Sequence, residues 1–507
     1  MQNAEIRNRN SDLVRTKLNP VRLWRHFADI CGMEHGSGNE FLLLTHIEQI
    51  ATRSECVSVR DENNNFLVYV PASKGLEDRQ VVCLQAHLDM VCEKRKEVQN
   101  IFPIELVLGE DGKLRANGST LGADNGIGVA AMIAVMTSEE IKHGPLELLF
   151  TSKEEIGLLG AKGFDYSLLR SKKIINLDCE DDSLFWVGCA GGSVMHGTFR
   201  PELIHHQVNK DTIQFAGDKN GEDFSKYLIK ISNFSGGHSG IDINLGRGNA
   251  IKILARILAE FTEFGLKIVD FSGGNAMNSI PREAESVFVI PTFYASGFKE
   301  VFDSLVSIIC KEYPSESPKI ELVECEIPSK IIYWNTHSTI KFLDCIIALP
   351  DGPLKMEPKN PSLVCTSVNL GICKTNDGEA VTIICSYRSS MKSQLDYTEQ
   401  ILTSVFQLSG MICMPIEGYL PWTPQFDTSL LKTATFVYET LFDNKPKLET
   451  VHAGLECAVF YKEISGAQII SCGPTMGDVH TPDEWVSVES VQKFWKFLTN
   501  FLEELAK

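Results

Sequence analysis

Several apolar runs in this chain lead into histidine and acidic residues of the kind that bind hydrolytic metals. In chain order the set is His87 and Asp89, Asp124, Glu154 and Glu155, Asp178, and His480. Imidazole nitrogen and carboxylate oxygen without thiolate suit a hydrolytic zinc or manganese site rather than a structural cysteine site. Adjacent glutamates place a general base beside a ligand. The set therefore predicts metal-assisted hydrolysis.

Each position also has an ordinary interpretation. His87 alone could be a satisfied core histidine, and Asp124, in a glycine-rich loop before an apolar helix, could be a helix cap. Glu154 and Glu155 could be acids in a first helical turn, and Asp178 could belong to an acidic loop. The residues favour a metal site only when they are taken together. A carboxylate such as Asp124 has two oxygens and can also bridge two cations about 3.5–4 Å apart.

The elements that must position these residues are alternating strands and helices. The apolar patterns predict a helix over residues 11–35, strands at 66–70, 81–86, 146–151 and 173–177, and a buried helix at 126–138. Strands that alternate with helices form an α/β sheet, and ligands gather at the carboxyl ends of its strands. We therefore expect His87, Glu154–Glu155 and Asp178 to meet at one sheet edge.

The pattern changes after Gly191-Gly192. It predicts strands at 212–215, 227–231, 287–291 and 381–385, and helices near 247–264, 297–311 and 395–409. This unit has none of the candidate ligands, whereas His480 follows it and precedes a predicted helix over 489–505. We therefore predict an α/β catalytic domain at 1–193 and 412–507, interrupted by an inserted α+β domain at 194–411.

Composition narrows the class of protein. Lys and Arg number 48 against 66 Asp and Glu, a formal charge of −18 that argues against nucleic acid and anionic membrane surfaces as partners. The polar start of the chain has no signal-peptide pattern, and no run is long enough to span a membrane. The 15 cysteines are scattered through apolar runs without a CxxC pair, which is typical of reduced thiols in a cytoplasmic protein.

Longer stretches carry a resemblance to a known family. They are QAHLDMVCEK (85–94), TLGADNGIGVA (120–130), TSKEEIGLLGAKGF (151–164), NLDCED (176–181), GGHSGIDI (236–243), GNAMNSIPRE (274–283), HAGLECA (452–458) and GPTMGDVHTPDE (473–484). In these stretches the chain resembles the cytosolic Xaa-His dipeptidases, which belong to the co-catalytic zinc peptidases and deacylases. The expected fold is thus a mixed-sheet catalytic domain with an inserted lid or dimerisation domain.

The resemblance also implies roles for the metal-site residues. Two zinc ions per chain, replaceable by Mn²⁺ or Co²⁺, would be bridged by Asp124. His87 with Asp178 would complete one site, and Glu155 with His480 the other. Glu154 would be the general base for the metal-activated water, and Asp89 would orient His87.

The inserted domain would supply the remaining functional residues. His238 would stabilise the oxyanion, and Asn278 and Arg388 would hold the carboxylate of a dipeptide, preferably one with C-terminal histidine. Arginine suits that task because its planar group can bind a carboxylate through two hydrogen bonds. The resemblance further suggests a homodimer formed through the inserted domain.

Other functions remain open at this point. Gly126-Ile-Gly128-Val-Ala-Ala131 fits a dinucleotide-binding pattern, but it lacks the apolar strand that must precede it. No GxSxG motif supports a serine hydrolase. A broader dipeptidase, a deacylase on the same scaffold and a non-catalytic zinc-binding scaffold protein stay as alternatives.

Overall fold

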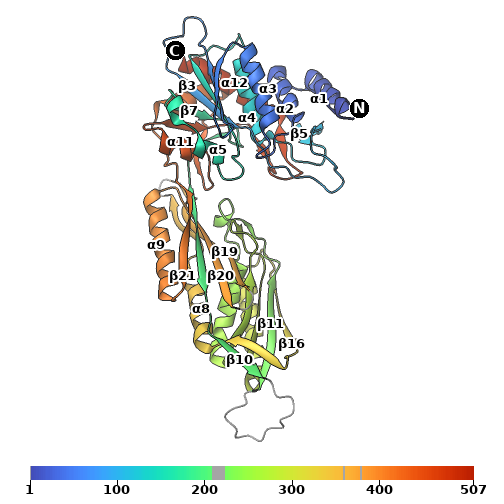
Figure 1. Cartoon of the computed structure of the whole chain (residues 1–507), viewed down its shortest axis with the longest axis vertical. Coiled ribbons are helices and arrows are strands. Elements are labelled where there is room, and N and C mark those ends of the chain that lie inside the picture. Colours follow the sequence, from blue (N-terminus) through green and yellow to red (C-terminus); the bar gives the residue numbers. More distant parts are fainter. Residues whose placement is uncertain (1, 208–222, 358–359, 377–378) are drawn as a thin grey trace. The chain divides into compact units, whose positions relative to one another are not determined.

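The computed structural model describes residues 2–207, 223–357, 360–376 and 379–507, and the chain divides into two compact units (Figure 1). The first unit comprises Met1–Cys189, Trp422–Val451 and Leu455–Lys507, and the second Ala190–Pro421 and His452–Gly454. The sequence pattern predicts the second boundary between the units at residue 411. Strand β21 (Ile412–Tyr419) pairs with β9 (Gly191–Phe199), and it therefore belongs to the second unit.

The first unit is built on a mixed sheet with the strand order β1-β2-β6-β3-β7-β23-β8-β22. The strands are β1 (Val57–Arg60), β2 (Phe66–Val70), β3 (Val82–His87), β6 (Leu146–Thr151), β7 (Lys173–Asn176), β8 (Leu184–Cys189), β22 (Lys447–Val451) and β23 (Gln468–Ser471). Strands β6, β3, β7 and β23 are mutually parallel. Strand β23, which follows the second unit in sequence, lies between β7 and β8.

Helices cover both faces of this sheet. They are α2 (Val21–Cys31), α3 (Phe41–Arg53), α4 (Ala123–Met136), α10 (Ser429–Phe442) and α12 (Val488–Leu505) on one side, and α5 (Leu159–Gly163) and α11 (Cys457–Glu463) on the other. Strand residues alternate between the two faces: Leu84 packs in the first core and Cys83 in the second. Gln85 and His87 therefore point to the α11 face.

A smaller sheet completes the first unit, with the order β24-β25-β5-β4. Its strands are β4 (Leu106–Leu108), β5 (Lys113–Ala116), β24 (Met476–Gly477) and β25 (Trp485–Ser487). The short loop between β24 and β25 carries His480. The pairing of β25 with β5 thus anchors this late segment of the chain to an early one.

The single helix predicted over residues 11–35 is wrong. The structure has two helices there, α1 (Gln2–Lys17) and α2, which begins after Pro20. Proline disfavours helical geometry in the residue before it, so the chain turns out of α1 and restarts as α2. The remaining strand and helix predictions in the first unit are confirmed to within three residues at their ends.

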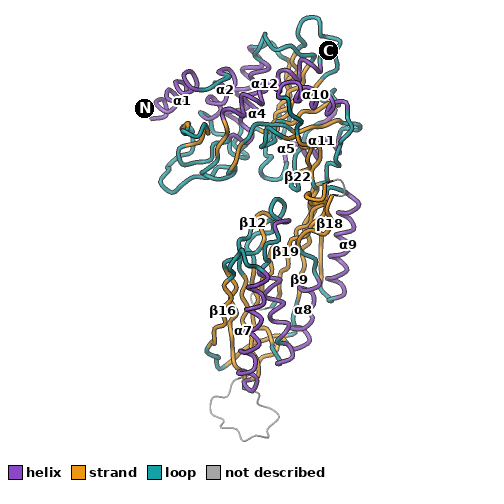
Figure 2. Tube along the Cα trace, turned by 180° about the vertical axis from the view of Figure 1, so that it is seen from behind, coloured by secondary structure: helices purple, strands orange, loops and turns teal. Residues whose placement is uncertain are grey.

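The second unit is a larger antiparallel sheet with helices packed on it (Figure 2). Its order is β16-β11-β15-β13-β19-β20-β9-β21, with β18 also paired to β19. The bounds are β11 (Phe224–Ser232), β13 (Lys267–Gly273), β15 (Ala284–Pro291), β16 (Lys319–Cys325), β18 (Gly352–Glu357), β19 (Asn360–Asn376) and β20 (Ala380–Ser389). The helices are α6 (Ala250–Glu260), α7 (Ala295–Glu312), α8 (Thr336–Ala348) and α9 (Lys392–Leu408).

Two short strand pairs complete the second unit. They are β10 (Leu203–Gln207) with β17 (Lys330–Trp334), and β12 (Gly237–His238) with β14 (Ser279–Ile280). The predicted strands at 227–231, 287–291 and 381–385 lie within β11, β15 and β20, whereas the one at 212–215 falls outside the described residues. Across the described parts of both units, no helix combines the length and apolar character needed to cross a bilayer.

Candidate functional site

Adjacent parallel strands bring most of the predicted ligands to one edge of the first unit's sheet. His87 is the last residue of β3 and pairs with Thr151, the last residue of β6. Glu154 and Glu155 follow β6, and Asp178 follows β7, the other neighbour of β3. The carboxyl ends of these strands form the edge where α/β sheets bind ligands, as the sequence pattern indicated.

Asp124 reaches this edge from a loop that another acid holds in place. The backbone N–H groups of Leu121, Gly122 and Ala123 donate to the Glu484 carboxylate at 2.6, 2.9 and 2.8 Å. Gly122 has a φ of 68°, a backbone conformation that glycine adopts without strain. Asp124 then leaves the helical path, with φ −83° and ψ 110°, before α4 continues. Glu484 thus fixes the turn that presents Asp124.

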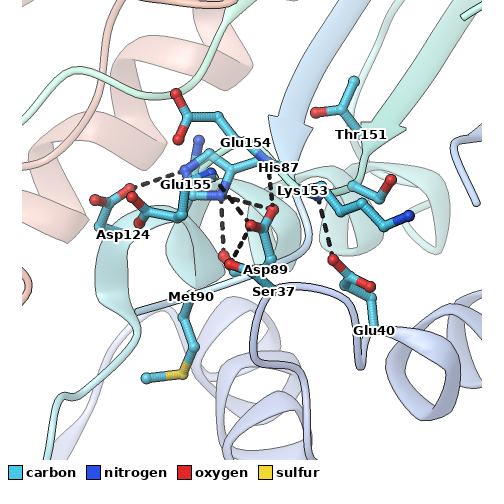
Figure 3. A network of polar contacts seen from close by, with 12 residues as sticks. Ser37, Glu40, His87, Asp89, Met90, Asp124, Thr151, Lys153, Glu154 and Glu155 are labelled. Atoms are coloured by element: carbon cyan, nitrogen blue, oxygen red, sulfur yellow. Dashed lines mark hydrogen bonds and ion pairs between the residues drawn. The ribbon is translucent and has the colours of Figure 1, made fainter. Parts of the chain in front are cut away.

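The two histidines share Asp124 between them (Figure 3 shows His87, Asp124 and Glu155). Nε2 of His87 lies 3.0 Å from one Asp124 oxygen and 3.3 Å from an Asp178 oxygen. Nε2 of His480 lies 3.1 Å from the other Asp124 oxygen and 2.9 Å from a Glu155 oxygen. Each imidazole therefore faces a pair of carboxylates, and Asp124 belongs to both pairs.

The backbone fixes the orientation of His87. Its Nδ1 lies 2.9 Å from the carbonyl oxygen of Asp89, to which it donates, so that Nε2 is the nitrogen left to bind a cation. The Asp89 carboxylate lies 3.7 Å from the same nitrogen, and it accepts from the N–H groups of Glu154 and Glu155, at 2.9 and 3.2 Å, and from the Ser37 hydroxyl at 2.7 Å (Figure 3). Asp89 thus orients His87 through its main chain and the glutamate pair through its side chain.

The donor set fits divalent metal ions. In the neutral tautomer of His87 a nitrogen lone pair faces carboxylate oxygens, an arrangement that repels unless a positive charge lies between them. Burial alone would lower the pKa of His87, but Asp178 and Asp124 raise it well above its usual value. Ligand atoms of His87, Asp124 and Glu155 lie within 4.8 Å of one another. Nitrogen and oxygen donors of this kind suit zinc, manganese or cobalt.

Glu154 differs from its neighbour in its electrostatic environment. Burial, together with the charges of Asp178 and Glu456, raises the pKa of Glu154 well above its usual value, although His87 acts in the opposite direction. A carboxyl group that exchanges its proton nearer neutral pH can serve as both general base and general acid. The shift of the Glu154 pKa is thus in the direction that suits a general base.

His238 lies in the second unit, on β12, with a defined hydrogen-bonding state. Its Nδ1 accepts from the N–H groups of Gly240 and Ile241 at 3.2 and 3.0 Å. Burial, helped by the charge of Arg388, lowers the pKa of His238, which favours the neutral ring. The remaining proton is therefore on Nε2. Asn278 lies beside this loop, because its carbonyl accepts from the N–H of Ser239 at 2.9 Å.

Arg388 lies on β20, and its Nη1 donates to the Tyr419 hydroxyl at 2.7 Å. His452 lies in the same unit: its Nε2 is 2.7 Å from the Ser367 hydroxyl, and burial and Arg388 lower the pKa of His452 to about 3. The second unit thus holds a set of neutral imidazoles around a guanidinium group. The predicted metal-site and lid residues occupy different units, each set organised within its own unit.

Three residues that contact or support the metal-site residues or the His238 and Arg388 group were not predicted from the sequence: Glu484, His452 and Glu456. Glu484 and His452 are described above, and Glu456 is fully buried beneath the metal-binding edge. All three lie in the motif stretches 452–458 and 473–484. For the two glutamates, an acid in an otherwise apolar or turn-rich stretch was the available signal, but their partners come from distant parts of the chain.

Residues 83–504 match the family model described as Peptidase family M20/M25/M40. The cytosol non-specific dipeptidase of Escherichia coli (strain K12) is 34% identical over 495 residues, 97% of this chain and 99% of that protein. The crystal structure of aminoacylhistidine dipeptidase from Vibrio alginolyticus aligns with a TM-score of 0.84 and 32% identity, over 96% of this chain and 97% of that one. The Bacillus cereus aminopeptidase PepT, at 16% identity and a TM-score of 0.58 over 97% and 100% of the two chains, shares the fold.

Proposed function

This chain belongs to peptidase family M20/M25/M40 and is a metallopeptidase of the dipeptidase kind, and from that premise we propose that it cleaves dipeptides, with a preference for Xaa-His, using two zinc ions and a glutamate base. The observation that carries the two-metal proposal is the position of Asp124. One of its oxygens faces His87 and the other faces His480. A carboxylate shared in this way is the bridging ligand that a two-metal site requires.

The first unit supplies the metal ligands and the base. His87 and Asp178 would hold one zinc ion, Glu155 and His480 the other, and Asp124 both. When bound, the zinc pair would lower the pKa of a water molecule and polarise the scissile carbonyl. Glu154 accepts the water proton and then delivers a proton to the leaving amine. Asp89 keeps Glu154 and Glu155 in position through their backbone N–H groups.

The second unit supplies groups for the substrate. His238, neutral and protonated on Nε2, is a donor suited to the developing oxyanion. Arg388, already oriented by Tyr419, is suited to the C-terminal carboxylate, and Asn278 to the same end of the dipeptide. A group that binds the C-terminal carboxylate would direct cleavage to the C-terminal peptide bond, which in a dipeptide is the only one.

The preference for a C-terminal histidine is supported by the similarity to the aminoacylhistidine dipeptidase, whereas the Escherichia coli relative is named a non-specific dipeptidase. We also propose a cytoplasmic location, after that relative's name, and a homodimer formed through the second unit. Light scattering coupled to gel filtration measures the mass in solution. A monomer over the working concentration range would dismiss the dimer without affecting the proposed chemistry.

The deciding experiment measures amino acid release from a panel of substrates after metal removal and after addition of Zn²⁺, Mn²⁺ or Co²⁺. The panel contains beta-Ala-His, Gly-His, Ala-Ala, a tripeptide and an N-acetyl amino acid. We expect metal-dependent cleavage of the dipeptides, fastest for the two that end in histidine, with the tripeptide spared. Equal rates for Ala-Ala would reject the histidine preference. Cleavage of the N-acetyl compound alone would reject the dipeptidase assignment, and one bound metal per active chain would reject the two-zinc mechanism.

A further inference from the structure

A row of buried polar side chains lies one layer below the metal-binding edge of the first unit. Gln85, Asn176 and Ser471 occupy paired positions on the adjacent strands β3, β7 and β23. Thr151 lies on β6, opposite His87. Each of these side chains is 0% exposed, as is Glu456, which precedes α11 on the same face. Strand positions buried under a helix are normally apolar, so this row needs a specific explanation.

The hydrogen bonds in this row have a direction. Asn176 Nδ2 donates to Gln85 Oε1 at 2.7 Å, and Gln85 Nε2 donates to the Thr151 hydroxyl at 3.0 Å. Gln85 Nε2 and the Thr151 hydroxyl then both donate to Glu456 Oε2, at 2.6 and 2.8 Å. Glu456 is therefore the common acceptor for polar groups from β3 and β6, and through Gln85 for β7.

Stability does not account for the row. Within the described residues Glu456 Oε1, Asn176 Oδ1 and Ser471 Oγ have no hydrogen-bond partner although they are buried. A buried polar group without a partner costs on the order of 1–3 kcal/mol, so a well-packed apolar row would stabilise the sheet more. Polar networks that are retained at such a cost are expected at functional sites.

In each strand that this network connects, a residue of the proposed metal centre follows the hydrogen-bonded side chain within a few positions. Gln85 precedes His87 on the same face of β3, Thr151 precedes Glu154 and Glu155, and Asn176 precedes Asp178. We propose that Glu456 is a positioning residue, which holds the ends of β3, β6 and β7 together and so sets the geometry of the metal ligands. The inference rests on the proposed metal centre and adds the group that supports it from below.

The test compares variants that differ in their ability to accept the two hydrogen bonds. Glu456→Leu removes the acceptor and keeps an approximate volume, whereas Glu456→Gln keeps one oxygen that can take both bonds. Glu147 is the matched control, because it is 1% exposed, lies on the same face of β6 and accepts from the N–H groups of Arg170 and Ser171 at 3.0 Å. Zinc affinity is measured on the purified full chain by competition with a chromophoric chelator, alongside kcat and KM.

Loss of a group that supports metal ligands typically lowers metal affinity or activity by about 10–100-fold. We expect that loss in zinc affinity and kcat for Glu456→Leu, with little change in KM. Glu456→Gln should restore both to within about threefold, because its amide oxygen accepts from the same donors. Glu147→Leu should lower thermal stability but leave zinc affinity unchanged.

Wild-type zinc affinity and kcat in a folded Glu456→Leu protein would overturn the proposal, and so would an equal loss of zinc affinity in Glu147→Leu. If Glu456→Leu does not fold, Thr151→Val decides, because it removes one donor at nearly constant shape: unchanged zinc affinity overturns the proposal and reduced affinity supports it. The zinc titration needs no substrate. A wild-type protein that binds zinc yet cleaves no dipeptide would therefore refute the proposed function and leave the positioning role standing.

Discussion

Replacing Glu484 by glutamine should weaken the loop that presents Asp124. The Glu484 carboxylate accepts from Leu121 and Gly122 on one oxygen, and from Ala123 and, at 3.4 Å, Asp124 on the other. Glutamine has a single oxygen, so its best orientation keeps the bonds from Leu121 and Gly122 and turns an NH₂ group toward the Ala123 N–H. The variant thus loses the bond from Ala123 and the longer one from Asp124, and it converts two charge-assisted bonds into neutral ones.

The magnitude follows from these changes. A hydrogen bond to a charged group contributes about 1.5–3 kcal/mol and a neutral one about 0.5–1.5 kcal/mol. Burial raises the pKa of Glu484 to about 7, so the variant should be destabilised by about 4 kcal/mol above that pH, where the wild-type group is ionised. The side chain of Glu484 is buried, which means that water cannot restore the lost bonds. The displaced Asp124 should also lower zinc affinity by about 10–100-fold, as loss of supporting groups commonly does.

Thermal unfolding of the first unit and competition for zinc with a chelator measure the two effects. Asp483→Asn is the control, because the neighbouring acid forms an exposed ion pair with Arg95 at 2.5 Å, and such pairs contribute about 1 kcal/mol or less. The reasoning fails if Glu484→Gln unfolds at the wild-type temperature with full zinc affinity. It also fails if Asp483→Asn loses as much as Glu484→Gln.

Three further predictions concern the proposed chemistry and the second unit. Glu154→Gln should bind zinc normally and lose about 10²–10⁴ in kcat, since general base catalysis contributes on that order; near-normal turnover in the metal-loaded variant would remove Glu154 as the base. His238→Ala should lose about 10²–10³ in kcat, the range for one oxyanion donor, whereas a parallel loss of zinc would assign it a different role. Because burial lowers the pKa of His452 to about 3, the unfolded chain binds a proton between pH 6.5 and 3 that the folded chain does not, and stability must decrease as the pH is lowered through that window. His452→Gln should therefore lose about 2 kcal/mol less than wild type between pH 6.5 and 5, as measured by denaturant unfolding; equal losses would contradict the shifted pKa.

The sequence was most informative where a local pattern determines the outcome. The run before His87 predicted β3 because strand-forming apolar residues end at a polar one, and the same pattern located β6 and β7. Parallel strands share a carboxyl edge, so the meeting of His87, Glu155 and Asp178 could be predicted without knowledge of the register. The break at Pro20 was missed because the apolar stripe around it continues in phase on both sides.

Long-range contacts could not be predicted in this way. Glu484 meets Leu121 across more than half of the chain, and Glu456 meets Gln85 across a similar separation. Neither pairing has a local signal, because the acid is an ordinary surface residue until a distant segment covers it. The same holds for the second contact of Asp89: its carboxylate lies 3.7 Å from Nδ1 of His87 and also accepts from the backbone of Glu154 and Glu155, which no local pattern indicated.

The place of β23 between β7 and β8 has a consequence for biosynthesis. When the ribosome has made residues up to 189, β7 and β8 exist, but the strand that separates them lies far downstream, beyond the whole second unit. The nascent first unit therefore has an open slot with unpaired strand edges, which are sites of aggregation in incomplete sheets. His480 and Glu484 arrive later still. Translation must thus finish nearly the entire chain before the acidic cluster at the sheet edge receives its last ligand.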